Sequence, residues 1–75
     1  MESETKQILE NIRKKRMEKG IPYEKLALEA GIARSHMYYI ESKRVIPTID
    51  TLVRIAKGLN ISLSELIDTA EVKQE

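Results

Sequence analysis

The sequence contains no cysteine, tryptophan or phenylalanine, and its only histidine is His36. Without cysteine there can be no disulfide framework and no thiolate metal site, and one histidine cannot form a histidine cluster. Two prolines and three glycines leave few breaks in the chain, which favours helices joined by short turns over a sheet. We therefore expect an all-α protein that carries no metal and no cofactor.

Long apolar runs and catalytic groupings are also missing. The chain begins with the polar stretch MESETKQ, so neither a membrane-spanning helix nor a signal peptide is expected. The residues supply no nucleophile beside a base, no carboxylate pair and no glycine-rich phosphate loop. We expect a cytoplasmic protein that is not an enzyme and has no membrane partner.

The charge is unevenly distributed along the chain. The 75 residues suffice for one small domain, and their formal net charge is +1. Residues 1–60 hold twelve Lys or Arg against eight Asp or Glu, whereas residues 61–75 hold one against four. An excess of positive charge in the body permits a phosphate partner, although a solvated helix face produces the same imbalance.

Apolar residues recur every three or four positions in five segments, which is the spacing of one helix face. The pattern predicts helices from about residue 5 to a stop at Gly20, over 23–30, over 34–42, from a cap at Thr48 to about Lys57, and from a cap at Ser62 to Asp68. Gly58 and Asn60 are expected to end the fourth helix, and Leu63, Leu66 and Ile67 to be buried in the fifth. The predicted domain covers residues 5–68, and residues 69–75 form a polar tail.

The most informative stretch is residues 26–40, LALEAGIARSHMYYI. Its inward-facing residues are Leu26, Ala27 and Ala30 before Gly31, and Met37 and Ile40 after it. Ala27 allows the second short helix to approach closely, and Gly31 can adopt the positive φ that a tight corner requires. This spacing indicates a helix-turn-helix at about residues 23–42.

Six blocks in order resemble one family: IRKKRMEKG at 12–20, LA at 26–27, AGI at 30–32, MYYIE at 37–41, PTIDTL at 47–52 and AKGLNISLSEL at 56–66. Together they resemble the DNA-binding domains of the Cro and phage-repressor type, often called XRE-like. The resemblance implies a compact five-helix bundle of the lambda-repressor-like type. It also implies an ion pair between Arg16 and Glu41.

The sequence departs from the family pattern at two helix starts. Pro22 and Tyr23 stand where a Ser or Thr cap followed by glutamine is usual, and Ala33 replaces another Ser or Thr cap. The family's glutamine often contacts phosphate. The hydroxyl of Tyr23 can make a similar contact with a different reach.

The outward face of the segment 34–42 is the predicted DNA-reading surface, and it carries Arg34, Ser35, Tyr38 and Tyr39. Arg34 and Ser35 lie at the amino-terminal end, which normally enters the major groove. Arg34 can donate two hydrogen bonds to guanine, and Ser35 can bond a base or a phosphate. His36 lies between the two faces and is expected to be half-buried.

Two interpretations of Tyr38 and Tyr39 remain open. One ring contacts a thymine methyl group or a sugar while its hydroxyl meets phosphate, or it folds back over Ile46 or the fourth helix. Lys43 and Arg44 follow the segment directly. We expect these two cations to contact phosphate, although ordinary loop solubility also accounts for them.

These residues predict a sequence-specific regulator of transcription that binds double-stranded DNA, most simply a repressor acting by occlusion. A homodimer is expected because one small module buries only about 600–1,000 Å² on DNA, with Leu63 and Ile67 as candidate contact residues. No small-molecule effector is indicated. The alternatives are a protein-interaction module that docks through Tyr38 and Tyr39, or an antitoxin-type or restriction-modification controller protein with the same fold.

Overall fold

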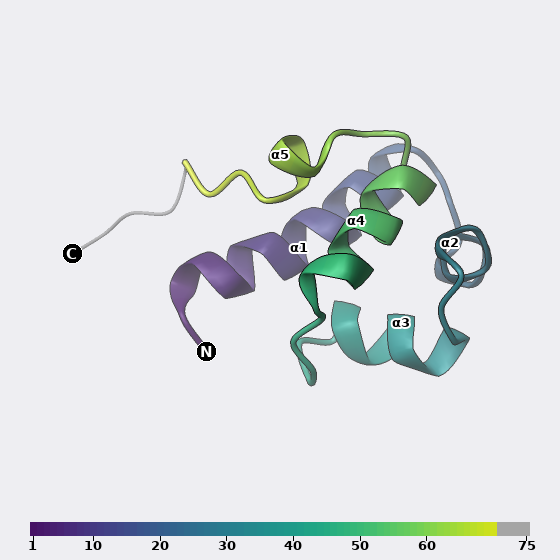
Figure 1. Ribbon diagram of the computed structural model, residues 1–75, viewed down its shortest axis with the longest axis horizontal. Coiled ribbons are helices and arrows are strands. Elements are labelled where there is room, and N and C mark those ends of the chain that lie inside the picture. The colour runs from purple at the N-terminus through teal and green to yellow at the C-terminus, as the bar shows by residue number, and fades with distance from the viewer. Residues whose placement is uncertain (71–75) are drawn as a thin grey trace.

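The structure is a computed structural model that describes residues 1–70, and this part of the chain is all-helical (Figure 1). Its helices are α1 (Ser3–Glu18), α2 (Tyr23–Ala30), α3 (Arg34–Glu41), α4 (Ile49–Gly58) and α5 (Leu63–Leu66). In Figure 1, α3 lies at the lower edge and α5 at the upper edge, with α1 and α4 between them. The predicted five-helix, all-α bundle is confirmed, and α1 starts two residues before the predicted Thr5.

The core is aliphatic and receives side chains from every helix. Its buried hydrophobic members are Leu9, Ile12, Leu26, Ala27, Ala30, Met37, Ile40, Leu52, Ile55, Ala56, Leu59 and Leu66. Each fully buried leucine, isoleucine or methionine side chain contributes roughly 1.5–3 kcal/mol of transfer free energy. Because α2 packs against both α3 and α4, burial of this one cluster fixes the relative positions of the short helices.

A glycine corner joins α2 to α3. Gly31 has a φ of 69°, in the left-handed region that a β-carbon disfavours. The Ile32 amide donates to the Ala27 carbonyl at 3.0 Å and closes the end of α2. Ala33 is extended and offers no side-chain cap. The start of α3 at Arg34 therefore depends on packing of the helix against the core.

The end of α4 agrees with the prediction except at Gly58. Asn60 makes the left-handed turn at a φ of 57°, as expected, whereas Gly58 is still the last helical residue. A β-carbon on Gly58 would lie 2.9 Å from Leu26 Cδ1 and 3.6 Å from the Ala30 amide nitrogen. Gly58 therefore allows α2 and α4 to approach closely.

The fifth helix is a single turn, and its expected burial is partly wrong. Ser62 caps it by accepting a hydrogen bond from the Glu65 amide at 3.1 Å, as predicted. Leu66 is fully buried, whereas Ile67 is 39% exposed because the helix ends before the next turn would carry it inward.

The segment after α5 is attached to α1 through one buried amide. Asn11 donates from Nδ2 to the Leu66 and Asp68 carbonyl oxygens at 2.9 and 2.8 Å. These bonds satisfy carbonyls at the end of a short helix. Of the predicted tail, Thr69 and Ala70 are non-helical, and residues 71–75 lie outside the described part of the chain.

Candidate nucleic-acid interface

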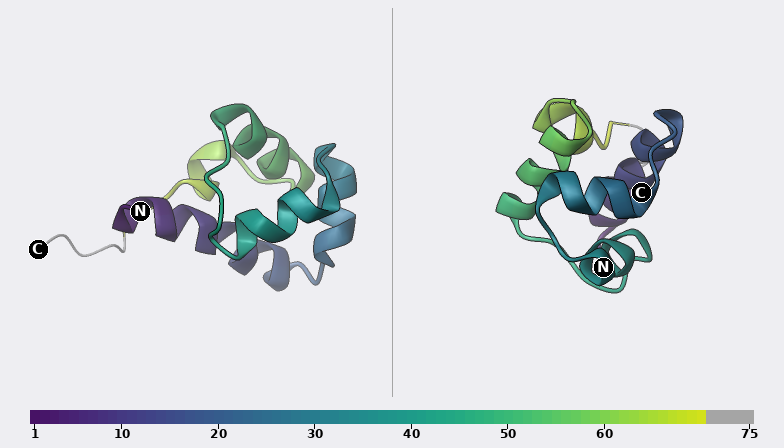
Figure 2. Two further views of the ribbon diagram at one scale, coloured as in Figure 1. Left: turned by 90° about the horizontal axis from the view of Figure 1, so that it is seen from below. Right: turned by 90° about the vertical axis from the view of Figure 1, so that its right-hand side faces the viewer.

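The outward side of α3 is uncovered. Met37 and Ile40 point into the core and are fully buried, which turns Arg34, Ser35, Tyr38 and Tyr39 to the surface. Seen from below in Figure 2, left, α3 lies in front of the other helices. The predicted faces of this helix are confirmed, and His36 is half-buried between them.

Three tyrosines form a continuous row across α2 and α3. The ring centroids of Tyr23 and Tyr38 are 6.3 Å apart and tilted, and those of Tyr38 and Tyr39 are 5.8 Å apart in an edge-on arrangement. Such pairs contribute about 0.5–1.5 kcal/mol beyond area burial. Tyr23 is half-buried against the core, so it anchors the row.

The two exposed rings do not fold back over Ile46. Tyr38 is 49% and Tyr39 42% exposed, while Ile46 is itself 66% exposed. Their rings contact each other, Tyr23 and Arg44. The row therefore presents aromatic surface to the outside.

Arg34 lies against the first ring of the row. Its guanidinium carbon is 5.9 Å from the Tyr23 ring centroid, within the range of a cation–π contact. A side-chain hydrogen bond to Tyr23 raises the pKa of Arg34, and the charges of Tyr23 and Glu24 act in the same direction. Sequence reasoning missed this contact, for which the eleven-residue separation gives no periodic signal.

Arg44 lies at the other end of the row. Its guanidinium carbon is 5.9 Å from both the Tyr38 and the Tyr39 ring centroids. It follows Lys43, whose φ of 63° turns the chain sharply away from α3. The row of three rings thus has Arg34 beside Tyr23 and Arg44 beside the two rings of α3.

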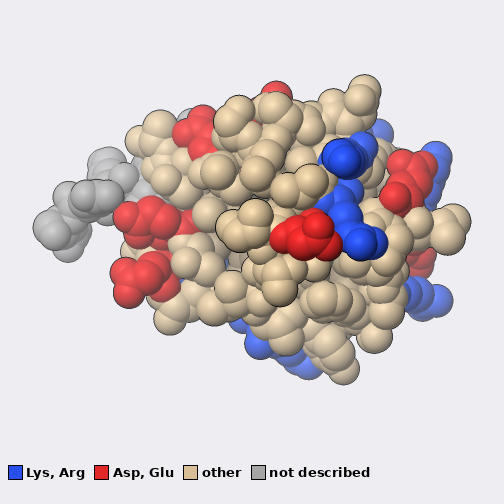
Figure 3. Space-filling view, viewed as in Figure 1, with Lys and Arg blue, Asp and Glu red and all other residues tan. Residues whose placement is uncertain are grey.

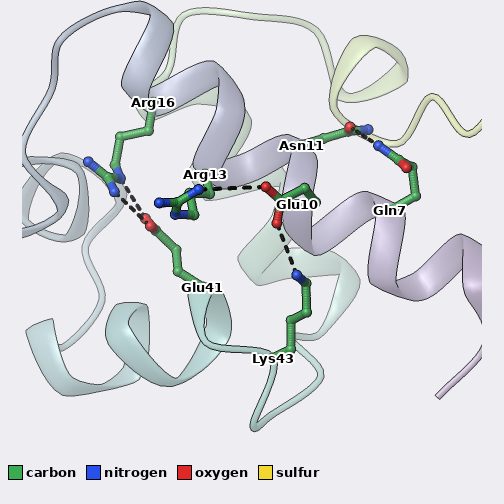
Figure 4. A network of polar contacts seen from close by, with 7 residues as sticks. All are labelled: Gln7, Glu10, Asn11, Arg13, Arg16, Glu41 and Lys43. Carbon is green, nitrogen blue, oxygen red and sulfur yellow. Dashed lines mark hydrogen bonds and ion pairs between the residues drawn. The ribbon is translucent and has the colours of Figure 1, made fainter.

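Lys43, which was expected to contact phosphate, pairs with a carboxylate of the protein itself. Its Nζ lies 2.9 Å from Glu10 Oε2 on α1, and Glu10 also faces Arg13 at 3.7 Å (Figure 4). These side chains are two-fifths to one-half exposed, so the pairs contribute little to stability. Lys43 can reach a phosphate only by sharing or leaving this carboxylate.

A bidentate ion pair fixes the angle of α3. Arg16 donates from Nε and Nη2 to the two carboxylate oxygens of Glu41 at 2.7 and 2.8 Å, and from Nη1 to the Ile21 carbonyl (Figure 4). The two side chains are only 15% and 10% exposed. The ion pair that the resemblance implied is confirmed, and it connects α1 directly to the end of α3.

The surface also shows where charge gathers. In Figure 3, acidic side chains without basic neighbours lie near the end from which the grey terminus emerges, basic ones appear along the lower edge, and both kinds are interspersed in the centre and at the right-hand end. Within residues 1–70 no group of three His, Asp or Glu could hold a metal ion. None of the described helices has the length and apolar character of a membrane span.

An uncovered helix after a glycine corner, supported by α1 and carrying polar and basic side chains outward, is the geometry of a helix-turn-helix DNA-binding module. A family model described as helix-turn-helix matches residues 12–66. The chain belongs to this family, in its XRE-type form, and is a DNA-binding regulator of transcription.

Individual relatives narrow the comparison. The chain is 35% identical over 71 residues to control protein C.SmaI of Serratia marcescens, across 93% of this chain and 84% of that protein. Its fold is similar to that of the wild-type restriction-modification controller protein C.Esp1396I, with a TM-score of 0.84, 28% identity and full coverage of both chains. It also resembles the restriction-modification controller protein C.AhdI from Aeromonas hydrophila, with a TM-score of 0.77, 27% identity, and 84% and 94% coverage.

Proposed function

We propose that this chain binds double-stranded DNA sequence-specifically by placing α3 in the major groove. The observation that carries the proposal is the uncovered outward face of α3, with Arg34 and Ser35 at its amino-terminal end. This is the end of a recognition helix that meets base edges. The Arg16–Glu41 pair, whose side chains are only 15% and 10% exposed, supports the proposal because it connects the end of α3 to α1.

Each exposed side chain has a proposed role. Arg34 reads guanine through its planar fork, which is worth roughly 1–3 kcal/mol of discrimination, and Ser35 bonds a base or a phosphate. Arg44 contacts phosphate, and Lys43 joins it by sharing its charge between Glu10 and the DNA. Tyr38 and Tyr39 face the groove. Tyr23 remains part of the proposed interface. Its hydroxyl is a partner of Arg34 and can also contact a phosphate.

The relatives favour a particular biological role. Because control protein C.SmaI and two controller proteins share this fold along most of their length, we propose that the chain controls genes of a restriction-modification system. It acts on cytoplasmic DNA by occupying an operator, and repression by occlusion of the polymerase is the simplest mechanism. A homodimer on a two-fold-related site supplies the affinity that one small module lacks.

Selection of bound sites from a random duplex library tests this proposal. We expect an enriched sequence with two related half-sites, and binding that weakens steeply as salt rises. Arg44→Ala should weaken all duplexes alike and lower the salt slope by about one, whereas Lys57→Ala, a cation on α4, should leave the slope unchanged. A flat salt response with no enriched site would replace this proposal with a protein-interaction module that docks through Tyr38 and Tyr39.

A further inference from the structure

The aromatic area on the reading face needs a partner. Two rings that are 49% and 42% exposed lie side by side on the outward side of α3. Exposed aromatic area carries a free-energy cost in water that burial removes. On a helix that enters DNA, apolar groups on the floor of the groove can cover these rings.

The rings form part of a shallow depression with a mixed lining. Its walls are Tyr23, Arg34, Ser35, Tyr38 and Tyr39. The distances from Arg34 to the Tyr23 ring and from that ring to the Tyr38 ring place the guanidinium at most about 12 Å from the Tyr38 ring. That upper limit corresponds to no more than roughly four base-pair steps. Polar and apolar contacts with neighbouring bases can therefore be made together.

The major groove offers little apolar surface. Hydrogen-bond donors and acceptors dominate the edges of adenine, guanine and cytosine there, and the C5 methyl group of thymine is the largest apolar group. Cytosine acquires the same group when it is methylated at C5. A tyrosine ring pressed against any other base edge would remove water from polar atoms without replacing their hydrogen bonds.

We propose that the Tyr38–Tyr39 wall of this depression is a binding site for the C5 methyl group of a pyrimidine, a few base pairs from the guanine that Arg34 reads. The inference rests on the proposed binding of α3 in the major groove and specifies the chemistry that the groove must present. Arg44 lies beside both rings of the wall, and Arg34 lines the same depression. The two cations favour a nucleic-acid occupant over an apolar protein segment, because DNA offers phosphates and base acceptors to them.

Replacement of single thymines by deoxyuracil in a selected operator tests the site, because it removes one methyl group and leaves every hydrogen bond unchanged. Burial of one such group is worth about a fourfold change in affinity. We expect a loss of that size at one or two positions of each half-site and no change at the others. Fluorescence anisotropy on matched duplexes gives the ratio, and 5-methyldeoxycytosine in place of deoxycytosine at each position shows whether a methylated cytosine is accepted as well as thymine.

Substitutions of Tyr38 and Tyr39 test whether these rings cause the difference in affinity between thymine and uracil duplexes. Tyr38→Ser and Tyr39→Ser combined should bring the thymine-to-uracil ratio to one, with low salt used to keep binding measurable. Tyr38→Phe should keep the ratio even where the lost hydroxyl weakens binding to both duplexes, and Leu28→Ser, an exposed apolar residue of α2, should keep it too. Equal affinity for thymine and uracil duplexes at every position would overturn the methyl site and leave sequence-specific binding standing. Failure to select any duplex would overturn both.

Discussion

At the scale of single residues, Tyr23 affects the site most directly, because it contacts the side chain of Arg34. Its ring is packed against the core, whereas Arg34 is an exposed side chain with many rotamers. A guanidinium held by a ring and a hydroxyl loses part of its rotamer entropy before it meets a base. Tyr23 is therefore a positioning residue for Arg34.

Tyr23→Phe tests this role because it keeps the ring and removes the hydroxyl. We expect discrimination at the guanine that Arg34 is proposed to read to fall by roughly two- to fivefold, because the guanidinium loses the hydroxyl that helps to orient it. Binding of the variant to duplexes with and without that guanine measures the ratio. In an Arg34→Ala background the same change should have no further effect on it. Uniform weakening on all duplexes would instead make Tyr23 a phosphate contact.

At the scale of the elements, α3 is held from one side by packing and from the other by a single ion pair. Its amino-terminal cap is absent, since Ala33 has no side-chain acceptor, and its length is eight residues. Such a helix is marginal alone. Its orientation therefore depends on Met37 and Ile40 in the core and on Glu41 at its last turn.

Glu41→Ala should destabilise the fold by about 3–5 kcal/mol, because it leaves the largely buried Arg16 without its anionic partner. Urea unfolding followed by circular dichroism gives the change in free energy. Asp50→Ala removes the partner of Arg54 from an exposed pair on α4, and its cost should stay below about 1 kcal/mol. Comparable losses in the two variants would show that the Arg16–Glu41 pair does not fix α3.

Gly58→Ala probes the approach of α2 to α4. The added carbon would lie 2.9 Å from Leu26 Cδ1, and overpacking of this kind costs about 1–3 kcal/mol. Helix propensity favours alanine by about 1 kcal/mol in a helix interior and by less at the last residue, so we expect a net loss of stability. Thermal unfolding should show a smaller loss in a Leu26→Val background, which removes the clashing atom. An equal loss in both backgrounds would contradict the close contact.

At the scale of the whole molecule, the reading helix and the end of the described chain lie on different sides. α3 and α5 occupy opposite edges of the bundle (Figure 1). This arrangement lets a second copy join near α5 without covering α3. Of the two candidate residues for a dimer contact, Leu63 packs against the core and Ile67 is exposed. Ile67 is therefore the better candidate.

Ile67→Lys should therefore shift the protein from dimer to monomer, because it places a charge in an apolar contact. Sedimentation equilibrium should give the 8.6 kDa chain mass for the variant and twice that mass for the parent. Leu28→Lys, at a side chain 81% exposed on α2, should leave the dimer intact. An unchanged mass for Ile67→Lys would place the dimer surface elsewhere.

The helices, the glycine corner and the outward face of α3 could be predicted from the amino-acid sequence alone, because apolar spacing and the conformational freedom of Gly31 are local properties. The positions of Arg34, Ser35, Tyr38 and Tyr39 followed from that periodicity. The close approach at Gly58, the pair of Lys43 with Glu10 and the contact of Tyr23 with Arg34 became visible only in the folded chain. These contacts join residues 11 to 33 positions apart, or depend on the space between two helices. Helical periodicity relates only residues three or four apart, so it carries no information about such contacts.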